Sequence, residues 1–303
     1  MSTQIECHKA NARGSCCIVK MRHDIHDTRK GILNLKQALA HIDLRRFAPS
    51  VRAAHRVENY WYVHWNLGRA VFVNENIPFP SVNFTFEVDP QNPTLRESVI
   101  TGVWTTNYRR RLTGEGFVAG VKFRPGAFYG LSDTPVSSLT DKVVAARDVF
   151  SAPVGFPDFF PDFSVTPEEF EREQLPTIDN WAASLNQTMA HEQRQIIRTV
   201  EAIEGGADYP KTSELASALE MTGRQLQRVF KKYVGVRPKW ILSRARIRKA
   251  VHEMSKTGAS EKDLASLAMK LGYYDQAHFN RDFKLMTGSP PLDYWKAQAP
   301  PGE

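Results

Sequence analysis

The chain contains very little cysteine: three residues among 303, at Cys7, Cys16 and Cys17. Because no cysteine follows position 17, no disulfide can join parts of the folded body, and small secreted disulfide scaffolds are excluded. Sparse cysteine is typical of proteins in a reducing compartment, so we predict a cytoplasmic protein.

Long apolar runs and enzymatic motifs are also missing. No stretch approaches the roughly 20 apolar residues of a membrane span, and the apolar patch at 16–19 is too short for a secretory leader. The sequence has no phosphate-binding glycine loop, no nucleophile elbow and no pair of carboxylates at a useful spacing. We therefore expect no enzymatic activity, no cofactor and no contact with a membrane.

Acidic residues are missing from one segment in particular. Residues 221–252 contain ten Lys or Arg and no Asp or Glu. The net charge of +7 arises in the last third of the chain: residues 1–204 hold 23 basic and 23 acidic residues, whereas residues 205–303 hold 17 and 10. A solvated helix face usually mixes both signs. A basic patch this concentrated indicates a polyanionic partner, with nucleic acid favoured over a membrane surface.

The pattern of the first half is mostly that of β-structure. After a loose tail at 1–25, residues 26–150 contain short alternating segments separated by Pro and Gly. In "NYWYVHWNL" (59–67), Trp, Val, Trp and Leu alternate with Tyr, His and Asn, which is typical of a half-buried strand. "SVNFTFEV" (81–88) and "GFVAGVKF" (116–123) show the same alternation. Such short strands predict a sandwich or a small barrel.

The pattern of residues 151–205 predicts a linker followed by connector helices. Its start, "SAPVGFPDFFPDF", is rich in proline and cannot continue a helix or a central strand. Helical periodicity runs over 166–204, and "EGGADYP" breaks it. Residues 206–303 are helical thereafter. The expected order is therefore a β-rich domain followed by an all-α domain.

The helical tail contains an internal repeat. Residues 215–235, "LASALEMTGRQLQRVFKKYVG", and residues 264–288, "LASLAMKLGYYDQAHFNRDFKLMTG", begin with Leu-Ala-Ser and end in Arg-x-Phe-Lys-x-x-x-Gly. A proline follows three positions after each final glycine. Each copy predicts a helix, a tight turn and a second helix, with Thr222 or Asp275 as the N-cap residue. That order is the helix-turn-helix plan.

Helical geometry separates the core of each second helix from its outward face. At about 100° per residue, the apolar side chains gather on one side. The expected core residues are Leu226, Val229, Phe230 and Tyr233 in the first copy and Phe279, Phe283 and Met286 in the second. The outward residues, which we predict to contact DNA, are Arg224, Gln225, Gln227, Arg228 and Lys231 in the first copy and Gln276, Ala277, Asn280, Arg281 and Lys284 in the second. His278 falls outside this arc, which indicates a packed or capping role.

The side chains on these outward faces suit DNA. Arg can form two hydrogen bonds to O6 and N7 of guanine, and Asn or Gln can pair with N6 and N7 of adenine. An ordinary solvated face would be filled with Glu and Lys instead. We therefore predict that the second helix of each copy is a recognition helix for double-stranded DNA.

The same residues carry a resemblance to a known family. "LQRVFKKYVGVRPKW" and, more specifically, "LGYYDQAHFNRDFKLMTGSPPLDYW" resemble the double helix-turn-helix domain of AraC/XylS-type transcriptional regulators, over residues 205–297. The resemblance implies two three-helix units joined by a long helix, for which "KWILSRARIRKAVHEM" (239–254) is suited. It also implies that both recognition helices enter successive major grooves of promoter DNA, with RNA polymerase as a further partner.

The front half resembles the β-rich sensor domain that precedes such tails in part of this family. The segments are "ENYWYVHWNL", "IPFPSVNFTFE", "GVWTTNYRRRLTGEGFVAGVKFRPGAF" and "LTDKV". The resemblance implies a cupin-like domain that holds a small-molecule effector and can form a homodimer. His55 and His64 are single histidines, too few for the ligand set of a metal cupin, so we expect no metal. The residues that we place in the effector pocket are Trp61, Trp65, Phe84 and Arg124.

The expected fold is an α+β, cupin-like sensor domain followed by an all-α double helix-turn-helix domain. The expected function is a sequence-specific, effector-responsive transcriptional regulator that acts as an activator. Two alternatives remain open: a DNA-damage or redox sensor that uses Cys7, Cys16 and Cys17 with the same tail, and an architectural DNA-binding protein with an inert front half. Deletion of residues 1–20 would discriminate the first alternative, because only that function needs the cysteines.

Overall fold

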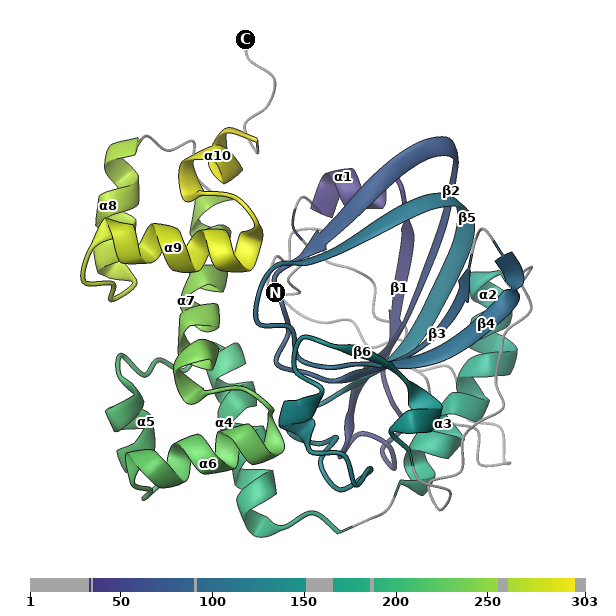
Figure 1. Cartoon of the computed structure of the whole chain (residues 1–303), viewed down its shortest axis with the longest axis horizontal. Coiled ribbons are helices and arrows are strands. Elements are labelled where there is room, and N and C mark those ends of the chain that lie inside the picture. Colours follow the sequence, from purple (N-terminus) through teal and green to yellow (C-terminus); the bar gives the residue numbers. More distant parts are fainter. Residues whose placement is uncertain are drawn as a thin grey trace, which may run out of the picture.

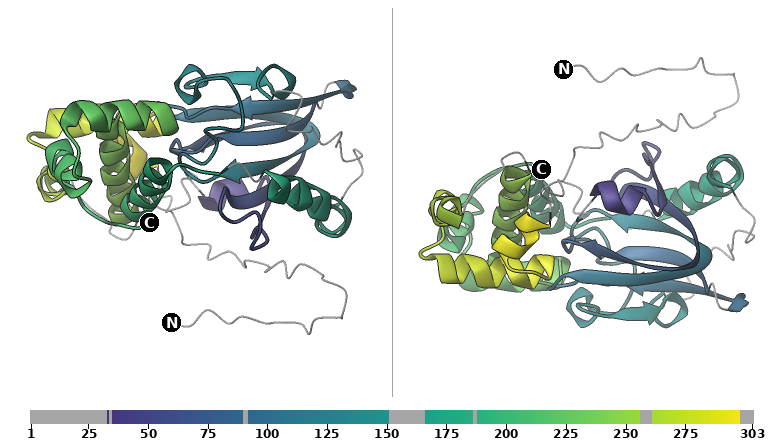
Figure 2. Two further views of the ribbon diagram at one scale, coloured as in Figure 1. Left: turned by 90° about the horizontal axis from the view of Figure 1, so that it is seen from below. Right: turned by 90° about the horizontal axis from the view of Figure 1, so that it is seen from above.

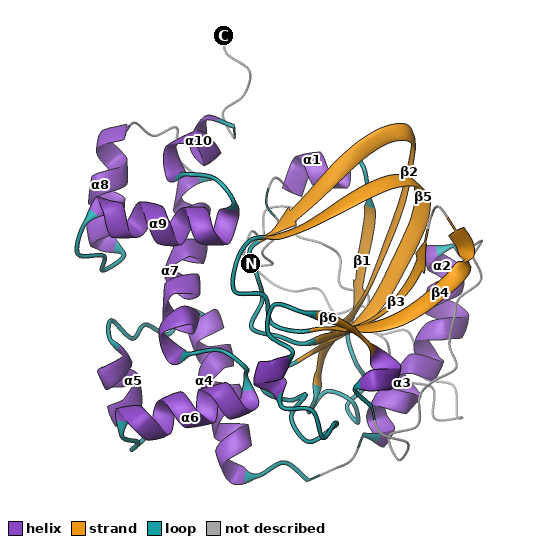
Figure 3. Cartoon of the chain, viewed as in Figure 1, coloured by secondary structure: helices purple, strands orange, loops and turns teal. Residues whose placement is uncertain are grey.

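The structure is a computed structural model and describes residues 33, 35–89, 92–150, 166–185, 188–255 and 261–297. A β-rich half and a helical half lie side by side (Figures 1 and 3). The first half contains α1 (Leu35–Leu39), β1 (Asp43–Phe47), β2 (Val57–Asn76), β3 (Asn83–Asp89), β4 (Asn92–Thr101), β5 (Tyr108–Phe123), η2 (Val136–Ser138), β6 (Val143–Ala145) and η3 (Ala146–Asp148). The later elements are α2 (Pro167–Glu169), η5 (Phe170–Gln174), α3 (Leu175–Ser184), α4 (His191–Glu204), α5 (Thr212–Ala218), α6 (Gly223–Tyr233), α7 (Pro238–Met254), α8 (Glu261–Lys270), α9 (Gln276–Thr287) and α10 (Pro291–Lys296).

The described strands form one antiparallel sheet, in the order β1-β2-β5-β3-β4-β6. The three strands expected from alternation are confirmed, because they coincide with parts of β2, β3 and β5. β2 and β5 pair along most of their lengths and continue past a register shift between Asn66 and Val71. A two-sheet sandwich, one of the two expected architectures, is wrong for the described strands, since they all belong to a single sheet.

The first half of β2 is buried on both faces, whereas alternation predicted burial on one. Tyr60 and Tyr62 are fully buried on the face that α3 covers, and Trp65 is 2% exposed on the opposite face. On that opposite face Ala38 of α1 and Ile42 join the cluster around Trp65. A strand covered on both sides has no solvent-facing row, so the tyrosines of the row that alternation placed in solvent are buried as well.

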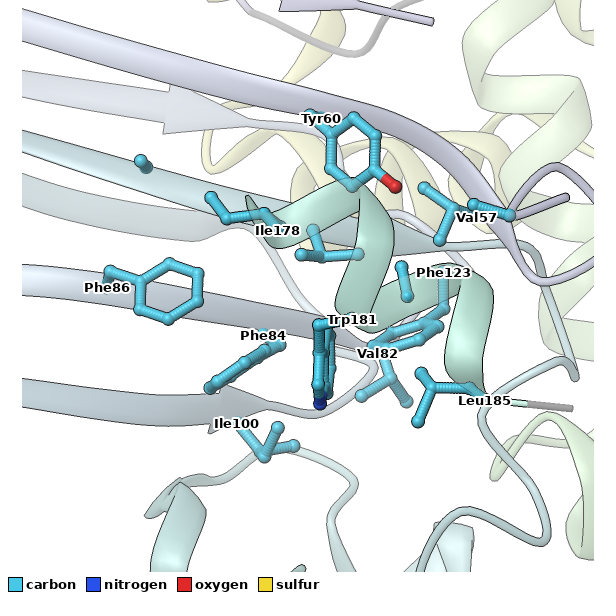
Figure 4. Close-up of a cluster of buried hydrophobic side chains, with 14 of the residues drawn as sticks. Val57, Tyr60, Val82, Phe84, Phe86, Ile100, Phe123, Ile178, Trp181 and Leu185 are labelled. Carbon is cyan, nitrogen blue, oxygen red and sulfur yellow. The ribbon is translucent and has the colours of Figure 1, made fainter. Parts of the chain in front are cut away.

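α3 completes the main core of the β-rich half. Ile178 and Trp181 from this helix lie beside Phe84 and Phe86 of β3 (Figure 4). The ring centroids of Phe84 and Trp181 are 5.2 Å apart. Each fully buried side chain of this kind contributes roughly 1.5–3 kcal/mol of hydrophobic stabilisation. The helix therefore packs as part of the β-rich half, although it lies within the segment that the sequence assigned to the connector.

The helical half contains two separate cores joined by α7. Residues of α4, α5, α6 and the start of α7 form the first core, and residues of α7, α8, α9 and α10 form the second. Trp240, near the start of α7, packs against both cores. Two helical units joined by a long helix were expected, and this arrangement is confirmed.

The domain boundaries remain predictions. Ile196, Val200 and Ile203 of α4 lie in the first core of the helical half, so a unit that starts at residue 206 would omit these packing partners. The tail predicted at 1–25, the proline-rich stretch at 151–163 and the three cysteines lie outside the described residues. Within the described ranges, no helix combines the length and the apolar character that a membrane crossing requires.

Candidate DNA-binding surface

α6 begins at a complete capping box. The Thr222 hydroxyl accepts a hydrogen bond from the Gln225 N–H at 3.2 Å, and the Gln225 side chain accepts one from the Thr222 N–H at 2.8 Å. The predicted N-cap is therefore confirmed. The Gln225 side-chain oxygen accepts hydrogen bonds within this capping box, so it already has partners. The four expected core residues are at most 1% exposed. The predicted contact residues are all exposed: Arg224, Gln225, Gln227, Arg228 and Lys231.

α9 begins at Asp275, whose Oδ1 accepts a hydrogen bond from the His278 N–H at 2.6 Å. This predicted N-cap is confirmed as well. His278 is half-buried and lies edge-on to the Tyr273 ring, with centroids 5.2 Å apart, which confirms its packed role. Three residues form the core stripe, as predicted, and are at most 1% exposed: Phe279, Phe283 and Met286.

The predicted contact residues of α9 are not equally open. Ala277, Arg281 and Lys284 are exposed, whereas Gln276 and Asn280 are half-buried. The Asn280 Oδ1 atom is buried and has no hydrogen-bond partner among the described residues. Arg281 is therefore better placed than Asn280 to reach a base edge.

α6 and α9 lie on the same side of α7, as the views in Figures 1 and 2 agree. The β-rich half contacts the C-terminal ends of both helices. The Thr140 hydroxyl donates to the Gly235 carbonyl at 3.0 Å, and the Asn107 N–H donates to the Leu285 carbonyl at 2.8 Å. The outward faces carry exposed cationic side chains and stay open to a partner. Two recognition helices on one side of a domain can contact two segments of the same DNA duplex.

Some basic residues of the acid-free segment do not belong to this surface. The side chains of Arg244 and Arg248 are 0% and 8% exposed, and both bind Glu204 at the end of α4. Burial raises the pKa of the Glu204 carboxyl, but the charges of the two guanidinium groups outweigh this effect and hold the pKa below its ordinary value. Arg244 also donates to the Pro78 carbonyl between β2 and β3. Sequence reasoning missed this cluster, because a charge count does not distinguish buried arginines from exposed ones.

The four residues placed in the effector pocket do not share one face of the sheet. Trp61 and Trp65 lie together on the face opposite α3. Phe84 is fully buried beneath α3, and Arg124 pairs with Glu201 of α4. The structure therefore brings the two tryptophans together and separates the other two residues from them. In the described part of the chain, no group of three or more His, Cys, Asp or Glu residues is arranged to hold a metal.

Two capped helices with exposed Arg- and Gln-bearing faces define a DNA-binding transcriptional regulator. Residues 215–297 match a family model described as a helix-turn-helix domain. Residues 45–145 match a model described as a domain of unknown function (DUF6597). The C-terminal part of the chain is an AraC-type double helix-turn-helix domain, as predicted, and it follows a β-rich domain.

The fold is also similar to solved structures of ToxT from Vibrio cholerae. An apo ToxT variant is 10% identical, with coverage of 79% of this chain and 98% of that chain and a TM-score of 0.38. ToxT bound to an unsaturated fatty acid is 11% identical, with coverage of 84% and 93% and a TM-score of 0.33. No curated protein matches the chain by sequence.

Proposed function

We propose that the protein binds a specific DNA site by placing α6 and α9 in two successive major-groove segments of one duplex. The observation that carries this proposal is the pair of capped helices, both open on their outward faces and both on the same side of α7. Successive major-groove segments on one face of DNA lie about 34 Å apart. Because the two helices carry different side chains, one molecule should bind an asymmetric site.

The exposed residues of the two helices divide into readers and anchors. In α6, Arg224 and Arg228 have the donors that guanine requires, and Gln227 has the donor and the acceptor that adenine requires. In α9, Arg281 has donors for guanine. Lys284 lies near the end of α9, where an ammonium group suits a phosphate. Phosphate contacts position the protein, whereas base contacts confer the sequence preference. Gln276, Ala277 and Asn280 of α9 complete the proposed contact set, as do Gln225 and Lys231 of α6.

Replacing Arg281 with alanine should weaken binding to the specific site by ~1–3 kcal/mol and relax the preference at one base position. Lys284→Ala is the matched control on the same helix, and it should weaken specific and non-specific binding alike. Selection from randomised duplexes, followed by titration of the selected and of an unrelated duplex, measures both effects.

The opposite pattern for Arg281 would contradict its role as a reader. If Arg281→Ala leaves the selected sequence unchanged and lowers affinity for all duplexes equally, α9 binds the backbone. The base preference would then depend on Arg224, Gln227 and Arg228 of α6.

A fragment spanning residues 188–303 should bind DNA without the β-rich half, with an affinity that falls steeply as salt rises. The fragment starts before α4, because residues of α4 complete the first core. If it neutralises about six phosphates, its affinity should fall roughly a thousandfold between about 50 and 200 mM salt. Fluorescence anisotropy with a labelled duplex measures this dependence. The β-rich fragment 33–185 is the control and should not bind, and a folded 188–303 fragment without affinity at low salt would refute the assignment.

We also propose that the β-rich half responds to a small-molecule effector. The sheet face opposite α3 carries Trp61 and Trp65. The guanidinium carbon of Arg110 lies 6.0 Å from the centre of the Trp65 ring, and Arg110 pairs with Glu87 at 2.7 Å. On the same face the Asn59 Oδ1 atom is buried and has no partner among the described residues. Ligand sites in proteins are lined mainly by apolar and aromatic side chains with a few polar groups, and this enclosed face has that composition.

This site can be tested by thermal unfolding of the full chain against a panel of small organic acids, amines and sugars. A compound that stabilises the chain should also change its affinity for the selected duplex, and Trp65→Phe should weaken the stabilisation. A stabilising compound that leaves DNA affinity unchanged would speak against an effector role.

We propose that the bound protein activates transcription through RNA polymerase and that the β-rich half supports a homodimer. The support for both is the AraC-type tail behind a β-rich domain. Transcription with purified RNA polymerase from a template carrying the selected site tests the direction of regulation, and a decrease in transcript would identify a repressor. Sedimentation of the full chain beside the 188–303 fragment tests whether dimerisation depends on the first half.

A further inference from the structure

A glycine follows each recognition helix, and the β-rich half packs against both glycines. Gly235, after α6, and Gly288, after α9, have φ angles of 91° and 87°, and they are the final glycines of the two repeat copies. A Cβ atom at Gly235 would lie 3.0 Å from Thr140 Oγ1, and one at Gly288 would lie 3.2 Å from Asn107 Oδ1. The repeat thus places two equivalent helix ends against two loops of the β-rich half.

Hydrogen bonds connect these loops to both recognition helices and to α7. The Thr140 hydroxyl and the Asn107 N–H each donate to a carbonyl at the end of a recognition helix, at 3.0 and 2.8 Å. A third hydrogen bond connects the loops to α7: Trp240 Nε1 donates to the Thr105 carbonyl at 2.9 Å. Trp240 itself packs against both helical cores.

Asp141 joins the two loops to each other. Its carboxylate accepts from the Thr105 N–H at 2.6 Å and from the Thr105 hydroxyl at 2.7 Å, and its own N–H donates to the Val103 carbonyl at 3.0 Å. Val103 is 1% exposed and lies within the first helical core. Asp141 has a φ angle of 57°, a left-handed conformation that costs energy for a residue with a side chain. The three hydrogen bonds of Asp141 stabilise this left-handed conformation.

We propose that these residues fix the separation of α6 and α9 and thereby the spacing of the DNA site. The set is called the bracket below and consists of Val103, Thr105, Asn107, Thr140 and Asp141. The two helical cores are distinct clusters, and α7 is the element that they share. A single helix leaves its two ends free to bend and twist against each other, whereas the bracket contacts both recognition helices. Thr105 and Asp141 are positioning residues in this proposal, which rests on the proposed binding of DNA by α6 and α9.

The first test measures the separation of the two units without DNA. Spin labels are attached at Ala218→Cys in α5 and Met269→Cys in α8, both at exposed positions, in a full chain whose three cysteines are replaced by serine. Double electron–electron resonance should show one narrow distance distribution for this parent. The distribution should become about twice as wide in Thr105→Val and in Asp141→Gly, because more relative orientations are populated.

The chain offers a matched control for the threonine. Thr106 is exposed and forms no hydrogen bond with the rest of the described residues, so Thr106→Val makes the same chemical change one position away. This variant should keep the narrow distribution of the parent. Asp141→Gly removes both acceptors and at the same time relieves the left-handed strain, so it should remain folded, which thermal unfolding verifies. Narrow distributions in both bracket variants would overturn the proposal and assign the spacing to α7 and the other contacts between the two halves, such as those of Ile77 and Pro78.

The second test measures the spacing of the DNA site. The duplex selected by the full chain is compared with duplexes that carry two extra base pairs between the two protected segments. The insertion shifts the segments by about 7 Å and rotates them by about 70°, which a rigid protein cannot follow. The affinity penalty for the insertion should be about fivefold smaller in Thr105→Val than in the parent, since one net hydrogen bond is worth a factor of roughly 2 to 12. Thr106→Val should keep the full penalty.

The two tests separate failure of the bracket from failure of the proposed function. If the parent selects no preferred duplex, DNA reading by α6 and α9 is wrong, and the distance distributions still decide whether the bracket holds the two units. If the parent selects a duplex but Thr105→Val and Asp141→Gly keep its spacing penalty unchanged, the bracket does not set the spacing.

Discussion

Replacing Phe283 with alanine should lower the free energy of unfolding of the second helical unit by ~3–5 kcal/mol. The Phe283 side chain is 0% exposed, and its ring centroid lies 5.6 Å from that of Phe279 and 5.5 Å from that of Tyr294. The neighbouring rings are attached to α9 and α10 and cannot collapse fully into the space left by the missing ring. In a unit of this size, such a loss is a large part of the total stability.

Two further variants make this expectation specific. Arg281→Ala lies on the exposed face of the same helix and should change stability by no more than about 0.5 kcal/mol. Phe230→Ala alters the equivalent position of the first repeat copy, which belongs to the other core. Hydrogen exchange should show lost protection in α8 to α10 for Phe283→Ala and in α5 and α6 for Phe230→Ala. Equal loss in both units from either variant would mean that the two cores unfold as one.

The local features of the helical half could be predicted because they depend on residues within one turn of each other. The N-caps Thr222 and Asp275 and the core stripe around Phe283 follow from spacing alone, and the structure confirms them. The exposed faces of α6 and α9 follow from the same periodicity. The half-burial of Asn280 and the use of Gln225 in a capping box were not expected, since they depend on side-chain conformation.

Features that depend on distant residues could not be predicted. Alternation in β2 indicated one buried face, but the burial of Tyr60 and Tyr62 depends on α3 and η5, more than a hundred residues later in the chain. The burial of Arg244 depends on Glu204 and Pro78, which no short pattern associates with it. The separation of Phe84 from Trp65 has the same origin, because the assignment of residues to faces requires knowledge of what covers each face.

Replacing Glu204 with glutamine should destabilise the protein by ~3–5 kcal/mol, because it removes the carboxylate that pairs with two buried guanidinium groups. The side chains of Arg244 and Arg248 are 0% and 8% exposed, and the Glu204 side chain is 18% exposed. Glutamine keeps the shape of the side chain and removes only its charge. Glu201→Gln, one turn earlier on α4, is the matched control: it breaks a pair with Arg124 whose side chains are 34% and 31% exposed, and it should cost ~0–1 kcal/mol.

The dependence of stability on pH should differ between the wild-type chain and Glu204→Gln. Because the pKa of folded Glu204 lies below its ordinary value of 4.5, its ionised form stabilises the fold, and this contribution is fully present above pH 4.5. The contribution is lost as the pH falls below 4.5 and through the folded pKa, so the difference in unfolding free energy between the two proteins should shrink over that range. Denaturant unfolding at a series of pH values measures this difference.

Two results would show that the two arginines do not depend on the Glu204 charge. Glu204→Gln could lower the unfolding free energy by no more than Glu201→Gln does, or its effect could stay the same as the pH falls. Arg244→Met in the Glu204→Gln background is the complementary variant: removing the buried guanidinium group of Arg244, which has lost its Glu204 partner, should recover part of the lost stability.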